Sequence, residues 1–273
     1  MTRTLADVCA VMAELWPPEG AESWDAPGLI AGDPGAEVRR IHLAVDAVLD
    51  TVDEAIDHGA QLLMVHHPLL LRGVTTVAED RYKGAVIARL IRAGCALLAV
   101  HTNADIVERG TSAALAARIG LSETVPIAPS SADATVGLGR VGRLREPVGL
   151  GTLARRLGEV LPATATGVRV AGAYDREVRT VALCAGAGDS LLTHPAVTSA
   201  DVYITSDLRH HPASEAVENA RVAGGPALID ISHWAAEWLW LDEAAAQLRE
   251  ALPGVEVAVS DLRTDPWDFT ILQ

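Results

Sequence analysis

The chain has 273 residues, with 22 basic and 36 acidic side chains and a formal net charge of −14. So acidic a surface repels phosphate backbones, and because the sequence holds no cluster of Lys and Arg, generic nucleic-acid binding is not expected. Hydrophobic residues make up 49% of the chain, but their runs are far shorter than the ~20 residues of a membrane crossing, so no transmembrane helix is expected.

The first predicted element is a helix over residues 5–16, where apolar side chains recur at helical spacing after Thr4, a capping residue. A loop rich in Gly, Pro and Asp follows at 24–35. From there short apolar strands alternate with helices that end at glycines. We expect strands at 41–45, 62–65 and 96–100, and helices at 50–58, 82–93 and 109–119.

Residues 126–133 are rich in Pro, Ser and Ala, which is typical of a linker. Beyond it we expect strands at 136–144, 168–171, 178–182, 202–205, 227–231 and 255–259, and helices at 152–160, 212–220 and 233–251. Short, fully apolar strands between helices indicate mixed, mainly parallel sheets covered by helices. The sequence therefore predicts two interlinked α/β domains, one formed by 1–128 plus 226–273 and the other, 129–225, inserted between.

The three cysteines, Cys9, Cys95 and Cys184, lie among apolar residues without CxxC spacing. This is typical of buried thiols in a reducing compartment, and Asp7 and Glu14 interrupt the apolar core that a secretion signal needs. We therefore expect a cytoplasmic protein.

Histidines collect directly after the apolar strands, at the carboxyl ends where open α/β sheets bind ligands. Six of the nine histidines follow this rule. The segments are His66-His67-Pro68, His101 to Asp105, Ser206-Asp207 with His210-His211, and Ser232-His233 with Glu237.

The spacing of these residues favours metal binding. His233 and Glu237 are four residues apart at a helix start, so they share one face and can hold one ion, and His101 and Asp105 have the same spacing. Just past a strand, His66 and His67 could serve two neighbouring ions. Imidazole and carboxylate without thiolate suit Zn²⁺, Mn²⁺ or Fe²⁺.

Each segment also has a purely structural interpretation. A polar turn would account for His66-His67-Pro68, and a helix entrance for His210-His211-Pro212. Asp105 could be an N-cap, and His233 and Glu237 could form an exposed pair on a helix. The turn at 186–190 could hold a phosphate on its backbone amides, although no basic residue accompanies it.

The chain resembles the Nif-three-like dinuclear metal-binding family, whose members are often named GTP cyclohydrolase 1 type 2. The resemblance lies in His66-His67-Pro68, the run from His101 to Asp105 and the late pair His233 and Glu237, in matching order along nearly the whole chain. The chain departs from the family pattern at Ser206-Asp207, where the family tends to carry Gly-Glu, at Ser232 and at Ala236.

The resemblance implies two interlinked α/β domains, a two-metal site in a cleft, and a ring-shaped homohexamer. It implies metal ligands at His66, His67, Asp105, His233 and Glu237, with His101 close by. Two divalent ions against two carboxylates leave about two positive charges, which favour an anionic substrate and water activated as a nucleophile.

We therefore expect a dinuclear metal-dependent hydrolase acting on a small, nucleotide-like molecule such as GTP. Asp207, His210 and His101 are the candidates for proton transfer. Two alternatives are a metal-loaded regulatory or interaction protein without turnover and a metal-dependent phosphoesterase.

Overall fold

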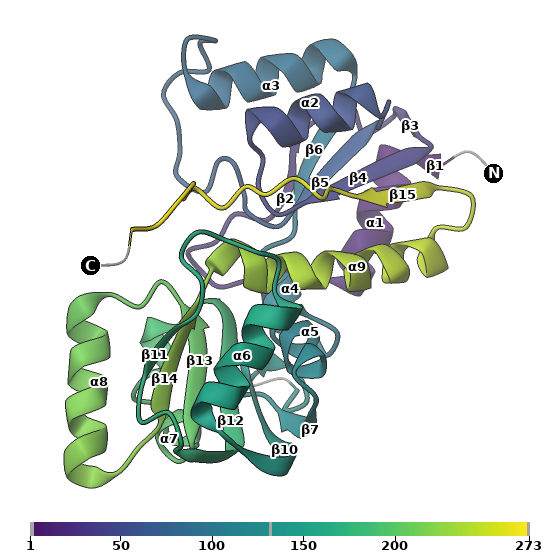
Figure 1. The fold of residues 1–273 in the computed structure, drawn as a ribbon. Helices are drawn as coiled ribbons and strands as arrows, with labels where there is room; N and C mark the ends of the chain where they lie inside the picture. The colour runs from purple at the N-terminus through teal and green to yellow at the C-terminus, as the bar shows by residue number, and fades with distance from the viewer. Residues whose placement is uncertain (1–2, 131–132, 272–273) are drawn as a thin grey trace. The chain divides into compact units, whose positions relative to one another are not determined.

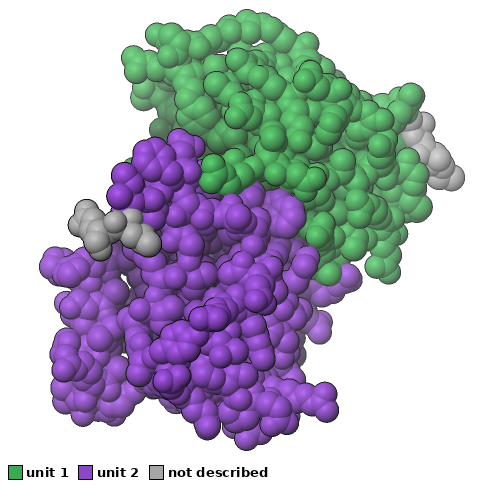
Figure 2. Space-filling view, viewed as in Figure 1, with its two compact units in different colours: residues 1–104, 241–264 green, residues 105–240, 265–273 purple. Residues whose placement is uncertain are grey.

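The computed structural model describes residues 3–130 and 133–271, and the chain divides into two compact units (Figure 2). Unit 1 consists of Met1–Ala104 and Leu241–Thr264, and unit 2 of Asp105–Trp240 and Asp265–Gln273. Each contains one large sheet with helices packed on it, which confirms the predicted α/β fold (Figure 1). The domain boundaries expected at 128/129 and 225/226 stay a prediction, and Ser131 and Ala132 of the expected linker lie outside the described residues.

The sheet of unit 1 has the strand order β15-β4-β5-β6-β2. The first four strands are parallel and β2 is antiparallel at the edge. Their bounds are Glu256–Val259, Arg40–Ala44, Leu62–Val65, Ala96–Ala99 and Gly28–Ala31. The expected loop at 24–35 therefore contains a strand, because hydrogen bonds from β6 order a segment whose own composition favours turns.

Three helices belong wholly to unit 1: α1 (Leu5–Leu15), α2 (Leu49–Asp57) and α3 (Tyr82–Ala93). The start of α1 is fixed by a capping box, in which Thr4 and Asp7 hydrogen bond to each other's backbone amides as the sequence predicts. Helices α2 and α3 cover one face of the sheet (Figure 1), where their apolar side chains form a core with Leu63, Val65, Leu97 and Ala99.

The sheet of unit 2 has the strand order β11-β14-β13-β12-β10-β7. The three middle strands β14, β13 and β12 form its parallel core through two pairings, β13 with β14 and β12 with β13. The outer strands β11, β10 and β7 pair antiparallel. Their bounds in sheet order are Arg169–Ala171, Ala227–Ile231, Val202–Ser206, Glu177–Ala187, Arg140–Gly149 and Leu121–Val125. The expected strand at 136–144 is divided, since β9 (Gly137–Leu138) pairs instead with β8 (Ala128–Pro129).

Alternate residues of β12 face the two cores of unit 2. Val181 and Leu183 pack in one cluster with residues of α5 and α6, while Ala182 and Cys184 pack in the other with Val197 of α7. The remaining helices are α4 (Thr102–Asp105), α5 (Thr111–Arg118), α6 (Leu150–Val160), α7 (Pro195–Thr198), α8 (His210–Ala223) and α9 (His233–Ala251).

The short elements are β1 (Arg3–Thr4), which pairs with β3 (Glu37–Val38), and the 3₁₀ turns Pro18–Gly20 and Asp189–Leu191. Across residues 3–130 and 133–271, no helix has both the length and the apolar character that a membrane crossing requires.

Candidate metal centre

Three histidines of unit 1 gather at the carboxyl ends of two neighbouring parallel strands. His66 and His67 follow β5, and His101 follows β6, whose Ala99 is in register with Val65. Their ring centroids lie 5.1 Å (His66–His67), 5.2 Å (His66–His101) and 5.6 Å (His67–His101) apart. One nitrogen of each ring lies within 4.8 Å of the others, which is close enough for a shared metal ion.

Each of these rings is held at its Nδ1 atom by an oxygen of the same unit. The Nδ1 of His66 lies 2.8 Å from the carbonyl oxygen of Val100, and that of His67 lies 2.7 Å from Oδ1 of Asp46. The Nδ1 of His101 lies 2.7 Å from Oδ1 of Asp25. Because these oxygens accept a hydrogen bond, Nδ1 is the donor in each ring, and Nε2 is the nitrogen through which such a histidine would bind a metal ion.

The carboxylates behind two of these rings are themselves fixed by threonines. Asp25, buried, accepts hydrogen bonds from the backbone amide of Thr102 at 3.0 Å and from its hydroxyl at 2.5 Å. Burial alone would raise the pKa of Asp25, but the hydrogen bonds from Thr102 and His101 outweigh it and hold the pKa below its usual value. Asp25 is therefore ionised at neutral pH. Asp46 accepts a hydrogen bond from the Thr264 hydroxyl at 2.5 Å.

In unit 2, the first turn of α9 brings His233 and Glu237 together as the sequence predicts. Their Nε2 and Oε1 atoms are 3.0 Å apart, and the Glu237 side chain is only 3% exposed, which rules out an exposed surface pair. The Nδ1 of His233 lies 2.7 Å from Oδ2 of Asp207. Burial would lower the pKa of His233, but Glu237 and Asp207 raise it well above the ordinary value.

Gly186, at the end of β12, leaves room for this pair. A Cβ at this position would lie 2.4 Å from Oε1 of Glu237 and 3.4 Å from Nε2 of His233, and the backbone has a φ of +77°. A Cβ at Gly188 would lie 2.3 Å from the Tyr203 hydroxyl. The glycines of the 186–190 turn therefore allow close packing, and this explains them without a phosphate.

Asp105, the last residue of α4, is buried and accepts a hydrogen bond from the Thr111 hydroxyl at 2.6 Å. The pKa of the Cys184 thiol is raised, mainly by burial and in addition by the negative charges of Asp105 and Glu237. Both carboxylates are thus near the same buried thiol of unit 2.

Two of the residues predicted for proton transfer, Asp207 and His210, lie in different surroundings. Asp207 is 61% exposed and has a φ of +58°, a left-handed conformation that costs a non-glycine residue about 1 kcal/mol or more. This conformation places its carboxylate on Nδ1 of His233. His210, at the start of α8, has its ring 5.1 Å from that of His211, and the structure does not place it against His233 or Glu237.

The residues present fit a divalent metal ion. The donor set is imidazole nitrogen and carboxylate oxygen, and the ring orientation of each histidine is fixed by an oxygen at its Nδ1. Sequence reasoning missed Asp46 and Asp25. Asp46 follows β4 and obeys the same strand-end rule as the histidines, whereas Asp25 lies in a loop that has no such signal.

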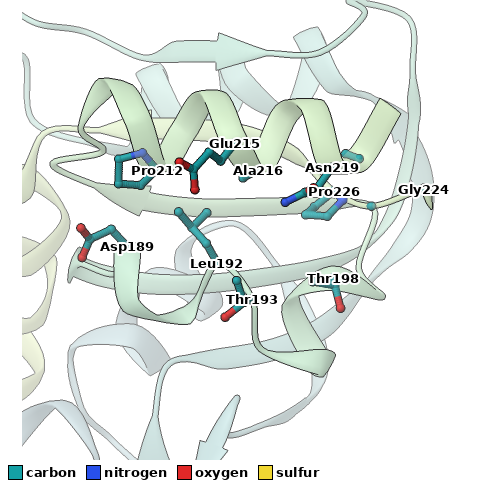
Figure 3. A pocket seen from close by; sticks show the side chains of 12 residues that line it. Asp189, Leu192, Thr193, Thr198, Pro212, Glu215, Ala216, Asn219, Gly224 and Pro226 are labelled. Atoms are coloured by element: carbon teal, nitrogen blue, oxygen red, sulfur yellow. The ribbon is translucent and has the colours of Figure 1, made fainter. Parts of the chain in front are cut away.

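A separate cavity of about 230 Å³ lies in unit 2, beneath α8 (Figure 3). Glu215 and Asn219 extend into it from the helix, and Asp189 lies at one end, where its carboxylate accepts a hydrogen bond from Arg209 at 2.5 Å. None of the candidate metal ligands lines this cavity. Its two carboxylates make it unsuited to an anionic ligand.

Comparison with known proteins gives consistent matches along the chain. A family model described as Duf34/NIF3 (NGG1p interacting factor 3) matches residues 3–266. A Streptomyces coelicolor protein named GTP cyclohydrolase 1 type 2 homolog is 48% identical over 269 residues, which cover 96% of this chain and 93% of that protein.

Solved structures share the fold. A Staphylococcus aureus hypothetical protein superposes with a TM-score of 0.88 at 26% identity, covering 98% of this chain and 99% of its own. A Bacillus cereus protein related to NIF3 gives a TM-score of 0.89 at 22% identity with the same coverage, a likeness of fold.

Proposed function

The chain belongs to the Duf34/NIF3 family, and we propose that it is a metal-dependent hydrolase of a nucleotide-like small molecule. In this proposal two divalent ions are held by the side chains of His66, His67, Asp105, His233 and Glu237. The supporting observation is the common arrangement of the imidazoles. His66, His67, His101 and His233 each have Nδ1 against an oxygen that fixes the orientation of the ring.

A bound Zn²⁺, Mn²⁺ or Fe²⁺ supplies Lewis acidity and lowers the pKa of water toward 7. The protein's own contribution is orientation. Asp46 fixes the ring plane of His67, and Asp207 fixes that of His233. Each carboxylate also makes the Nε2 atom of its histidine more basic, and therefore a stronger metal ligand. We assign Asp207 to this orienting role because its carboxylate is engaged at Nδ1 of His233.

His101 is the residue best placed to move a proton. Its Nδ1 is held by Asp25, which is kept ionised by Thr102, so Nε2 can take the proton of an attacking water while Asp25 stabilises the resulting imidazolium. His210 stays a prediction for proton transfer. A nucleotide-like substrate is supported by the name of the Streptomyces relative, and a homohexameric ring is the assembly that the family resemblance implies.

The test begins with metal content and then measures turnover. Purified protein reconstituted with Zn²⁺ or Mn²⁺ should bind about two equivalents per chain and open the purine ring of GTP, seen as a change in purine absorbance. His67→Ala and Glu237→Gln should abolish turnover and weaken metal binding by a factor of ~10–100 or more. The exposed residues His58 and Glu250, changed to Ala and Gln, are the matched controls and should leave both properties unchanged.

The alternatives predict different results. Phosphate release without a change in purine absorbance identifies a phosphoesterase, and bound metal without turnover of GTP or phosphoesters favours a non-catalytic binding protein. Fewer than one equivalent of any transition metal after reconstitution contradicts the two-ion proposal. The mass of the protein in solution tests the hexamer.

A further inference from the structure

The segment that follows β15 contains two adjacent residues, Thr264 and Asp265. Each of them hydrogen bonds to a residue that helps to position a candidate metal ligand. In unit 1, the Thr264 hydroxyl donates to Oδ2 of Asp46 at 2.5 Å. The other oxygen of the same carboxylate, Oδ1, lies 2.7 Å from Nδ1 of His67. Thr264 therefore fixes the carboxylate that orients His67.

In unit 2, Asp265 fixes the start of α9. The Ser232 hydroxyl donates to Oδ2 of Asp265 at 2.5 Å and accepts from the backbone amide of Ala235 at 3.3 Å, which caps the helix that begins with His233. Ser232 and Asp265 are buried. Oδ1 of Asp265 accepts the backbone amide of Trp267 at 3.1 Å.

The register of this segment is set a few residues earlier. The Ser260 backbone amide donates to the carbonyl oxygen of Leu43 at 2.8 Å, which continues the pairing of β15 with β4. The Ser260 hydroxyl donates to Oε2 of Glu54 at 2.5 Å. These contacts hold the chain so that Thr264 reaches Asp46 in unit 1.

We propose that Thr264 and Asp265 are a pair of positioning residues, an inference that rests on the metal-dependent function proposed above. Thr264 orients His67 within unit 1, and Asp265 fixes the start of α9, which carries His233 and Glu237, within unit 2. Neither side chain is itself a ligand. The pair acts through Asp46 on one side and through Ser232 on the other.

This arrangement makes the order of the C-terminal segment depend on metal binding. If the segment holds the ligands in their binding positions, bound metal must stabilise the segment by the same coupling free energy. Hydrogen–deuterium exchange of a peptide covering residues 261–271 should therefore slow when Zn²⁺ is added. A segment that only closes the fold would exchange at the same rate with and without metal.

The variants separate positioning from folding. Thr264→Val keeps the size of the side chain but removes the hydroxyl, and we expect Zn²⁺ affinity, measured by competition with a chromophoric chelator, to fall about tenfold. Thr264→Ser restores the hydroxyl and should restore affinity. Thr198→Val, at an exposed threonine of α7, is the matched control. Urea unfolding of each metal-free variant shows whether folding itself has changed.

Asp265→Asn tests the second contact, because it removes the charge that accepts the Ser232 hydroxyl. Reduced Zn²⁺ affinity in this variant supports the inference, and wild-type affinity overturns the role of Asp265. Wild-type Zn²⁺ affinity in Thr264→Val, or unchanged exchange of residues 261–271 on adding Zn²⁺, also overturns the inference while leaving the proposed function intact. A wild-type protein that binds no metal overturns both.

Discussion

Gly186 offers the most direct test of how closely Glu237 is held. Replacing it with alanine places a Cβ 2.4 Å from Oε1 of Glu237, well inside van der Waals contact, at a backbone φ of +77°. Two costs are therefore combined in Gly186→Ala. One is the left-handed backbone conformation, and the other is the steric conflict with the carboxylate.

The chain contains a control that separates these costs. Gly120 has the same φ of +77°, but a Cβ there would meet nothing within 4 Å. Gly120→Ala should therefore lower the free energy of unfolding by roughly 1–2 kcal/mol, the cost of the left-handed conformation alone. Overpacking of a buried position adds about 1–3 kcal/mol. For Gly186→Ala we expect a total loss of about 2–5 kcal/mol.

Urea unfolding of the metal-free variants measures the two losses, and chelator competition measures Zn²⁺ affinity. Gly186→Ala should weaken Zn²⁺ binding because Glu237 is displaced, whereas Gly120→Ala should bind as the wild type does. Equal losses of stability in the two variants, with unchanged Zn²⁺ affinity in both, would refute the steric reasoning.

Two further predictions concern the reactivity of the cysteines and the cap of α1. Burial raises the pKa of Cys95 to about 11, raises that of Cys184 further and raises that of the half-buried Cys9. At pH 8 iodoacetamide should modify Cys9 first and the other two only in urea, as followed by mass spectrometry; early modification of Cys184 would contradict its burial. Hydrogen bonds from the backbone and hydroxyl of Thr4 lower the pKa of Asp7, so its contribution to stability is present above its unfolded pKa of ~3.9 and is lost as pH falls through the lower folded value. Thr4→Ala should cost about 1 kcal/mol in urea unfolding at pH 7 and less at pH 3, and an equal cost at both pH values would argue against the capping box.

The sequence predicted the fold correctly where the residues of a segment themselves determine its structure. Short apolar runs gave the central parallel strands of both sheets, and helical spacing gave α9 with both of its predicted ends. The edge strands β2 and β7 were missed because their order comes from backbone pairing with β6 and β10, to which side-chain pattern contributes little.

The site shows the same division. The strand-end rule brought His66, His67 and His101 together, since parallel strands place their carboxyl ends at one edge. The partners of these rings were not predictable in the same way. Asp25 approaches His101 from 76 residues away, and aspartate adopts other conformations far more often than the left-handed one that brings Asp207 to His233.

Unit 1 is formed by two stretches of chain that are far apart in the sequence, and this has a consequence for biosynthesis. Strand β4 is made early, but its neighbour β15 leaves the ribosome more than 200 residues later. At ~5–20 residues per second the chain between β4 and β15 takes on the order of tens of seconds to make, and for that time one side of β4 in the nascent sheet has no partner strand. Thr264 and Asp265 leave the ribosome after all of the proposed ligands, so the contacts that orient His67 and fix the start of α9 form only after the ligands themselves have been made.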